Sequence, residues 1–478
     1  MLFHSQQFLV FFIVVFCTYW FVLDRFSHLS QLKKAWLLAA SYLFYMSWNV
    51  PLVSLLWLSS LVDFVAAREI HRIDMSHKGH RRRWLLLSLV TNLGVLGIFK
   101  YTNFLVDSFV ELFNTLGLPV GYVDLNIILP LGISFYTFQT MSYTIDVYRG
   151  KYAPYRSFLD FCLFVSFFPQ LIAGPIVRAD CFAYQLERPR RLHWPTFYHG
   201  TSRFIFGVFK KVILANQASA FADATFAAPS DFSGFICLIG VYAFAFQIYF
   251  DFSGYTDMAL GLLTLLGFKI PENFDHPYEA ASIREFWQRW HISLSTWLRD
   301  YLYIPLGGSR ISTLNTYRNL FITFGLGGLW HGAGWTFFIW GLLHGTYLSV
   351  ERLIRGHKFD RVRNPFLDTL MVILTFHLVC LSWVFFRAET FQKARDMLHQ
   401  ICGMDGFFVL SELGLFKPQN WAIGILLPFF ILVITRFHKV DKSLRSYPLV
   451  VSISILSGML FAIALITGGA NEFIYFQF

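Results

Sequence analysis

The sequence is poor in charged residues, since Asp, Glu, Lys and Arg make up only 14% of its 478 residues. A water-soluble domain usually carries about 25%, so this chain has too few charges to cover a surface that faces water. Apolar residues reach 56% and aromatic residues 19%. This composition excludes a soluble globular enzyme, a disordered chain and a disulfide scaffold. It favours a helical protein that crosses a membrane several times.

Several chemical motifs are also missing. The six cysteines include no Cys-x-x-Cys pair, so the sequence indicates neither a zinc site nor a disulfide framework. It contains no Gly-x-Ser-x-Gly elbow, no Walker loop and no His-Glu-x-x-His pair, the motifs of serine hydrolases, NTPases and zinc peptidases. His291, His331 and His344 lack the spacing of metal ligands. We therefore expect no metal.

Long apolar runs are abundant, from Phe8–Leu23 to Pro448–Thr467, and the loops between them are too short to hold a soluble domain. Some runs are too short to span a membrane alone, and Phe235–Phe268 is too long for one straight span. Because a span needs ~20 residues, we expect roughly 10–13 membrane helices in a single domain, residues 1–478. The first run has no Lys or Arg before it and no small-residue cleavage site after it, so we interpret it as a retained span.

Basic residues exceed acidic ones by 39 − 29 = 10. In a membrane protein this excess marks cytoplasmic loops, and we expect no nucleic-acid partner. Six Lys and Arg residues lie between Arg68 and Arg83, which predicts a cytoplasmic loop there and an N-terminus on the outer side. The basic stretches Arg352–Arg363 and Arg436–Arg445 predict two more cytoplasmic loops.

Glycine and proline interrupt several apolar runs, notably at Pro130–Gly132, Phe168–Pro175 and Gly325–Gly328. Irregular backbone at membrane depth is tolerated only where protein or a water-filled cavity covers it. Two interpretations stay open. Either the helices surround an internal cavity, or they are simply kinked where they pack against neighbours.

The segment Arg284–Gly308 carries too many charges for an ordinary span. As one helix, it would place Trp287, His291, Leu294 and Leu298 on a shared apolar face. We therefore expect an amphipathic or re-entrant helix along the bundle. On that face, His291 is either an active-site residue or a buried histidine with satisfied hydrogen bonds.

His331 lies deep inside the apolar run Leu320–Val350 and has glycines on both sides. An ionisable side chain inside a membrane is costly, so a functional role is the first hypothesis. The glycines leave room for a substrate or another helix to approach. A neutral imidazole here could act as a general base. The alternative is a histidine that forms hydrogen bonds between helices.

Two carboxylates, Asp251 and Asp257, interrupt another apolar run. Six residues correspond to about 240° around a helix, so the two do not face each other as a catalytic pair. We expect pairing with an arginine or capping of a helix break at Gly254. A proton relay is a further alternative.

Seven segments together resemble the membrane-bound O-acyltransferase family, in particular the bacterial branch that includes alginate O-acetyltransferase. They cover nearly the whole length of the chain. These segments are RWHISLS at 289–295, YLYIPLGG at 301–308, GLWHG at 328–332, PLGISFY at 130–136, LIAGP at 171–175, YFDFSGYTD at 249–257 and FIYFQF at 473–478.

The resemblance implies an all-α integral membrane protein, a polytopic helical bundle with re-entrant or amphipathic helices around a central tunnel. It implies that His331 is catalytic and that His291 is the second active-site residue. It also implies cooperation with other envelope proteins. Members of this branch modify alginate, cellulose, peptidoglycan or teichoic acid, so the motifs leave the acceptor open.

The reaction that fits is acyl transfer from a cytoplasmic thioester, acetyl-CoA, to a hydroxyl on the outer side of a bacterial inner membrane. The expected acceptor is an exported polysaccharide of the alginate or cellulose type, reached directly or through a periplasmic acetyltransferase in a synthesis and export complex. The lack of a soluble domain favours the second route. The alternatives are O-acylation of peptidoglycan or another cell-wall polymer, and a transporter or flippase.

Overall fold

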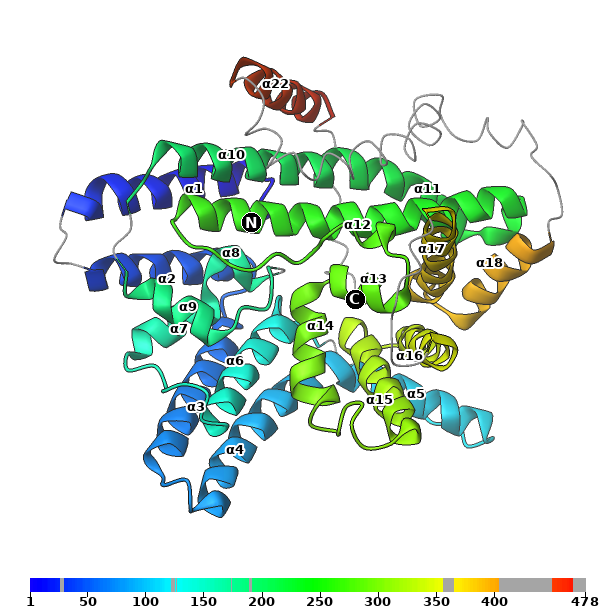
Figure 1. Ribbon diagram of the computed structural model, residues 1–478, viewed down its shortest axis with the longest axis horizontal. Helices are drawn as coiled ribbons and strands as arrows, with labels where there is room; N and C mark the ends of the chain where they lie inside the picture. The colour runs from blue at the N-terminus through cyan, green and yellow to red at the C-terminus, as the bar shows by residue number, and fades with distance from the viewer. Residues whose placement is uncertain are drawn as a thin grey trace. The chain divides into compact units, whose positions relative to one another are not determined.

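The computed structural model describes residues 1–25, 30–121, 125, 127–172, 174–188, 191–355, 365–403 and 449–466. All regular structure in these residues is helical, as the composition predicts (Figure 1). Within them, five helical stretches are long and apolar enough to cross a membrane: Gln6–Arg25, Lys78–Thr115, Trp194–Ala227, Gly234–Leu265 and Pro365–Arg387.

The number of 10–13 membrane helices and the single domain over residues 1–478 stay predictions. Several expectations lie outside the described residues. They are the apolar run at 421–437, most of the basic loop at 352–363, the basic loop at 436–445 and the motif at 473–478.

The described chain forms two compact units. Unit 1 comprises Met1–Gly200 and Leu262–Pro271, and unit 2 comprises Thr201–Gly261 and Glu272–Phe478. Two long helices, α10 (Trp194–Phe209) and α12 (Gly234–Leu265), contribute residues to both units. The other helices belong to one unit each.

In unit 1, three helices lie side by side (Figure 1), and they enclose the buried carboxylate of Asp63. They are α3 (Val53–Arg72), α4 (Lys78–Leu96) and α6 (Ile133–Tyr148). Asp63 of α3 accepts hydrogen bonds from Ser88 and from Asn92 Nδ2, the latter at 2.7 Å, and from Thr144 Oγ1 at 2.9 Å. These bonds provide hydrogen-bond donors for the buried Asp63 carboxylate and connect the three helices.

Aromatic rings pack several of the other helices of unit 1 against one another. The ring of Phe44 lies 5.7 Å from that of Phe8 and 5.8 Å from that of Phe168, centroid to centroid. The helices are α1 (Gln6–Cys17), α2 (Ser30–Met46), α5 (Thr102–Thr115), α7 (Phe158–Ser166), α8 (Phe168–Leu171) and α9 (Ala179–Leu186).

Two of the three expected glycine and proline breaks are confirmed. Gly132 precedes α6 with a φ of +72°, and a Cβ atom there would lie 2.5 Å from the Leu171 carbonyl oxygen. Helix α7 ends at Ser166, and the short α8 follows after Phe167. Irregular backbone in this unit is therefore packed against protein, as membrane depth requires.

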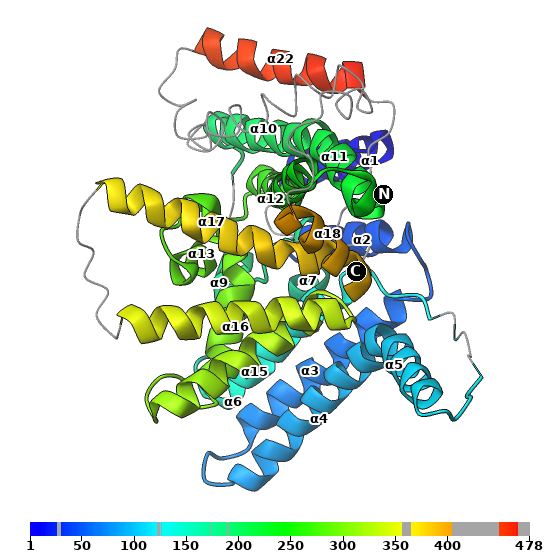
Figure 2. The same cartoon turned by 90° about the vertical axis from the view of Figure 1, so that its right-hand side faces the viewer.

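Unit 2 contains the helices of the candidate site. Figure 2 shows α15 beside α16, and α16 beside α17. Its helices are α11 (Asn216–Ala227), α13 (Ile283–Arg289), α14 (Ile292–Leu298), α15 (Thr313–His331), α16 (Trp335–Arg355), α17 (Pro365–Arg387), α18 (Phe391–Gly403) and α22 (Leu449–Ile466).

The third expected break, at Gly325–Gly328, is wrong, because α15 continues through it. These glycines instead allow close contact between helices. A Cβ atom on Gly328 would lie 2.2 Å from the Phe337 carbonyl oxygen, and one on Gly341 would lie 2.1 Å from that of Phe324. The expectation that another helix approaches the glycines beside His331 is therefore confirmed.

Candidate active site

The segment that carries His291 is held by hydrogen bonds at both of its helix starts. Ser282 accepts a hydrogen bond from the Glu285 backbone N–H at 3.1 Å, and the Glu285 carboxylate accepts one from the Ala281 N–H at 2.9 Å. Ser282 therefore caps α13, and the Glu285 carboxylate holds the residue before the cap. At the start of α14, Asn273 accepts bonds from the backbone N–H and the hydroxyl of Ser293, at 3.0 and 2.9 Å.

The expectation of one continuous helix in this segment is wrong. The chain breaks at His291, which has a φ of +42° and a ψ of +55° and precedes α14. Non-glycine residues seldom adopt this left-handed conformation, which costs of order 1–3 kcal/mol and persists only where the surroundings impose it. Here the Ile292 N–H donates to the Asn273 carbonyl oxygen at 3.0 Å. His291 therefore leaves the face that Trp287 and Leu294 share.

His331 is the last residue of α15, and the extended Gly332 ends the helix. Its side chain is buried, with 3% of its surface exposed. Three aromatic rings surround the imidazole, with centroid distances of 5.0 Å to Trp340, 5.1 Å to Trp330 and 5.5 Å to Phe386. All three are edge contacts, so the imidazole lies in a rigid aromatic frame.

A cavity of about 850 Å³ reaches His331 between α13, α14, α15 and α16. Its inner end is mostly aromatic, with the buried Trp287, His331 and Trp340 and the half-buried Phe324 in its wall. Its outer end is polar and mostly exposed. The outer end is lined by Arg284, Gln288, Arg299, Tyr303, Ser309 and Arg352. This volume is typical of a site for a small molecule.

The structure brings His291 and His331 together, with their ring centroids 6.1 Å apart. His291 is fully buried and contacts the rings of Phe252 and Trp330, at 4.7 and 5.9 Å between centroids. It is not among the residues that line the cavity. The helix break explains this difference from the expected placement, and it leaves His331 as the histidine that a ligand in the cavity can reach.

His344 makes hydrogen bonds between helices. The Trp287 indole N–H donates to its Nδ1 at 3.2 Å, and Ser382 Oγ lies 3.0 Å from its Nε2. Because an indole nitrogen only donates, Nδ1 accepts, and a neutral imidazole then donates from Nε2 to Ser382. His344 thus fixes Trp287 in the cavity wall.

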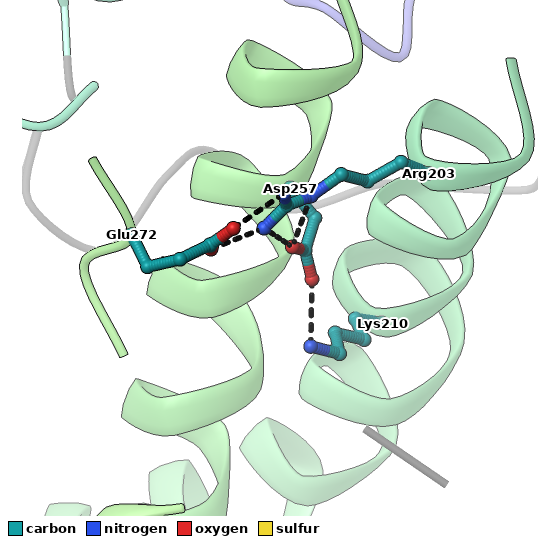
Figure 3. Close-up of polar contacts among 4 residues, drawn as sticks. All are labelled: Arg203, Lys210, Asp257 and Glu272. Atoms are coloured by element: carbon teal, nitrogen blue, oxygen red, sulfur yellow. Dashed lines mark hydrogen bonds and ion pairs between the residues drawn. The ribbon is translucent and has the colours of Figure 1, made fainter. Parts of the chain in front are cut away.

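The expected pairing of Asp257 with an arginine is confirmed, and a lysine joins it (Figure 3). Arg203 donates to Asp257 at 2.9–3.0 Å, and Lys210 donates to it at 2.7 Å. Arg203 also reaches Glu272 at 2.5 and 2.7 Å. Asp257 on α12 therefore binds Arg203 on α10 and Lys210, the residue directly after α10.

A second ion pair lies six residues earlier on α12, where Asp251 contacts the buried Lys211. Neither carboxylate caps a break at Gly254, because α12 is continuous from Gly234 to Leu265. The sequence showed both acids but not their partners, because Lys210 and Lys211 lie in another apolar run, where they resemble interfacial residues.

Other residues of the site were also missed. Asn273 and Glu351 act on backbone groups far away in the sequence, and Glu351 accepts hydrogen bonds from the N–H groups of Ile283 and Arg284 at 2.9 and 3.3 Å. Their only sequence feature was a polar residue beside an apolar run. No three His, Cys, Asp or Glu side chains in the described part of the chain are arranged to hold a metal.

Known proteins resemble the chain over the region of this site. A model of the membrane-bound O-acyltransferase family matches residues 153–360, which contain His291 and His331. A probable alginate O-acetylase of Pseudomonas aeruginosa is 43% identical over 435 residues, which cover 91% of this chain and 81% of the relative. A peptidoglycan O-acetyltransferase of Helicobacter pylori is 38% identical over 432 residues, covering 85% and 80%.

A more distant relative shares part of the chain. A teichoic acid D-alanyltransferase of Bacillus subtilis is 28% identical over 281 residues, which cover 56% of this chain and 70% of the relative. Together with the apolar helices, these similarities describe a multi-pass membrane enzyme. The chain belongs to the membrane-bound O-acyltransferase family, in the branch of the bacterial alginate O-acetylases.

Proposed function

We propose that this protein moves acetyl groups from acetyl-CoA in the cytoplasm across the bacterial inner membrane, for O-acetylation of an exported polysaccharide of the alginate or cellulose type. The names of its relatives support an O-acetylation role. The observation that carries the proposal is the position of His331, at the buried inner end of a cavity large enough for an acyl donor.

His331 is proposed as the catalytic base. Its imidazole takes the proton of the acceptor hydroxyl while that oxygen attacks the thioester carbonyl carbon. The carbon–sulfur bond then breaks, and the thiolate leaves with the proton that His331 returns. General-base catalysis of this kind contributes roughly 10²–10⁴-fold to a rate.

His291 is proposed as the second active-site residue. The sequence suggested that it orients the acyl group or donates to its carbonyl oxygen. Its place behind the cavity wall, 6.1 Å from His331 between ring centroids, favours a positioning role through His331. No substrate-contacting role for Ser293 or Ser295 is needed in this scheme.

The acceptor is proposed to be the polymer itself or a hydroxyl on a periplasmic acetyltransferase that passes the acetyl group on. Peptidoglycan is the second candidate polymer, because a peptidoglycan O-acetyltransferase is 38% identical. A transporter or flippase without acyl transfer loses its support, because the chain belongs to a family of acyltransferases.

Acetyl transfer from radiolabelled acetyl-CoA by the purified protein tests the proposal. The wild type should transfer the label to an added acceptor, and His331→Ala should lose this activity roughly 10²–10⁴-fold. The matched control is His399→Ala on α18, where the histidine is exposed. A well-folded His331→Ala protein with wild-type activity would exclude His331 as the base.

A further inference from the structure

One buried asparagine accepts hydrogen bonds from three groups that directly follow His291. Asn273 lies between α12 and α13 and is fully buried. Its backbone carbonyl oxygen accepts from the Ile292 N–H at 3.0 Å. Its Oδ1 accepts from the N–H and the hydroxyl of Ser293 at 3.0 and 2.9 Å. The first two residues of α14 are therefore fixed to one residue outside the helix.

The same segment, residues 273–276, also binds the chain just before His291. The Asp275 N–H donates to the Arg289 carbonyl oxygen at 2.9 Å, and Arg289 Nη1 donates to the His276 carbonyl oxygen at 3.3 Å. Hydrogen bonds to this segment thus hold the backbone on both sides of His291. Together they limit how the chain can turn there.

His291 has a backbone conformation that its own side chain does not favour. Its φ of +42° and ψ of +55° lie in the left-handed region, where a Cβ atom is crowded and glycine is favoured. Among the described non-glycine residues, only His276 in the segment beside it also has a positive φ. Such strain persists where the surroundings over-determine the backbone, and the bonds to Asn273 do so here.

The left-handed turn also determines where the His291 ring lies. On a continuous helix, a residue four positions after Trp287 would share its direction, toward the cavity wall that Trp287 lines. The turn instead places the ring against Phe252 of α12, at 4.7 Å between centroids, and 6.1 Å from the ring of His331. The relation between the two histidine rings therefore depends on this turn.

We propose that Asn273 is a positioning residue of the active site, which holds the left-handed turn at His291 and thereby keeps the His291 ring beside His331. Asn273 does not line the cavity, so it acts on the reaction through His291 and not on a bound donor. The inference rests on the proposed function for its effect on acetyl transfer. Its effect on the backbone at His291 can be tested without any reaction.

Glycine and alanine at position 291 provide that test. Both remove the imidazole, but only glycine adopts a positive φ without steric cost. His291→Gly should therefore melt about 2 °C or more above His291→Ala, although glycine is normally the less stable of the two. When Asn273→Ala is added to both, the turn is no longer imposed, and this difference should vanish or reverse.

Thermal unfolding in detergent gives the four melting temperatures. The same difference between glycine and alanine with and without Asn273 would overturn the proposal. Ser293→Ala is the milder variant in case Asn273→Ala does not fold. It removes one of the two bonds to Oδ1, so it should narrow the difference, and an unchanged difference would count against Asn273 in the same way.

Activity shows whether the turn matters for acetyl transfer. Asn273→Ala should lower kcat about tenfold or more and leave the KM for acetyl-CoA unchanged, because the cavity lining is intact. In a His291→Ala background it should cost little further, since it acts through that ring. Multiplicative losses would show that Asn273 acts elsewhere and would overturn its role.

Asn273→Asp should retain most of the activity and the glycine–alanine difference. A carboxylate accepts the same two bonds from Ser293, and the start of a helix favours a negative charge. The Asn273 Nδ2 has no hydrogen-bond partner among the described residues, so its loss removes no bond seen there. If Asn273→Asp behaved like Asn273→Ala, the accepted bonds would not be what holds the turn.

The matched control is Asn92→Ala in unit 1. Asn92 is also buried, and its side chain donates to Asp63 and accepts from Ser59. Its loss should lower the melting temperature but leave kcat of the folded protein and the difference at position 291 unchanged. A glycine–alanine difference that depends on Asn273, in a protein that transfers no acetyl group, would keep the turn and remove the proposed function.

Discussion

His331 on α15 and His344 on α16 are both buried, but their surroundings differ. The ring of Trp340 lies between them, with its centroid 5.0 Å from that of His331 and 5.0 Å from that of His344. His344 is bonded at both nitrogens to Trp287 and Ser382. His331 lines the cavity. Burial alone therefore does not distinguish the two histidines, whereas access to the cavity does.

A double-mutant cycle should show that His291 and His331 act as one unit. His291→Ala should reduce acetyl transfer strongly, and adding His331→Ala should reduce it little further, because losses within one catalytic unit are not additive. The measurement is kcat/KM for the four proteins. Fully multiplicative losses would show that the two histidines serve separate steps.

At the scale of helices, buried ion pairs and glycine contacts hold the elements that carry the site. The acids of α12 pair with Arg203 on α10 and with Lys210 and Lys211 just after it. The glycines of α15 allow α16 to approach it closely. Both features can be removed by single substitutions that leave the cavity lining unchanged.

Asp257→Ala should destabilise the protein much more than Glu272→Ala. Removal of Asp257 takes away the carboxylate that the buried Lys210 and Arg203 share. Breaking one partner of a buried pair typically costs about 3–5 kcal/mol. Glu272 is 56% exposed, and an exposed pair contributes about 0–1 kcal/mol. The free energy of unfolding in detergent gives the comparison, and equal losses would contradict it.

Gly328→Ala should disturb the contact between α15 and α16. Its new Cβ atom would lie 2.2 Å from a backbone oxygen, and such overpacking costs typically 1–3 kcal/mol. Because His331 follows three residues later, acetyl transfer should also fall.

Gly94→Ala is the control for this substitution. Gly94 also lies in a helix, and nothing lies within 4 Å of its added Cβ atom. It should leave stability unchanged or raise it by about 0.5–1 kcal/mol, since alanine favours the helix. Thermal unfolding of both variants decides, and similar melting temperatures would refute the close contact.

Local sequence patterns predicted some elements well and others poorly. The apolar runs gave the positions of helices such as α3 and α17, because burial and helical propensity act over neighbouring residues. The break at His291 was not predictable, because Asn273 imposes it from eighteen residues away. The glycines of α15 wrongly predicted a break, because the helix that they contact, α16, cannot be recognised from the neighbouring residues.

For the whole molecule, the sequence predicts an orientation in the membrane that remains to be tested. The turn between α3 and α4 should be cytoplasmic, because basic residues flank it on both sides. In a background without native cysteines, Ser76→Cys in intact cells should resist a membrane-impermeant reagent. Ser76 is exposed in the structure. Labelling of the cysteine from the outside would therefore show that the true orientation is opposite to the predicted one.

A control residue near the N-terminus completes this experiment. Gln6→Cys at the exposed start of α1 should react from the outside.

The candidate site was predicted only in part from the sequence. The sequence predicted His331 and His291 as site residues, and the structure places their rings 6.1 Å apart, centroid to centroid. It did not predict that Arg284, Arg299 and Arg352 line the same cavity, because only the folded chain brings them together.

The aromatic inner end of the cavity also bears on how the proposed donor would behave when no acceptor is present. Trp287 and Trp340 are 8% and 1% exposed, so a thioester beside His331 is shielded from bulk water. Enclosure of this kind suppresses side reactions of reactive groups. In the proposed reaction, acetyl-CoA hydrolysis without an acceptor should therefore be slow. The cell would then consume little acetyl-CoA while no polymer is being exported.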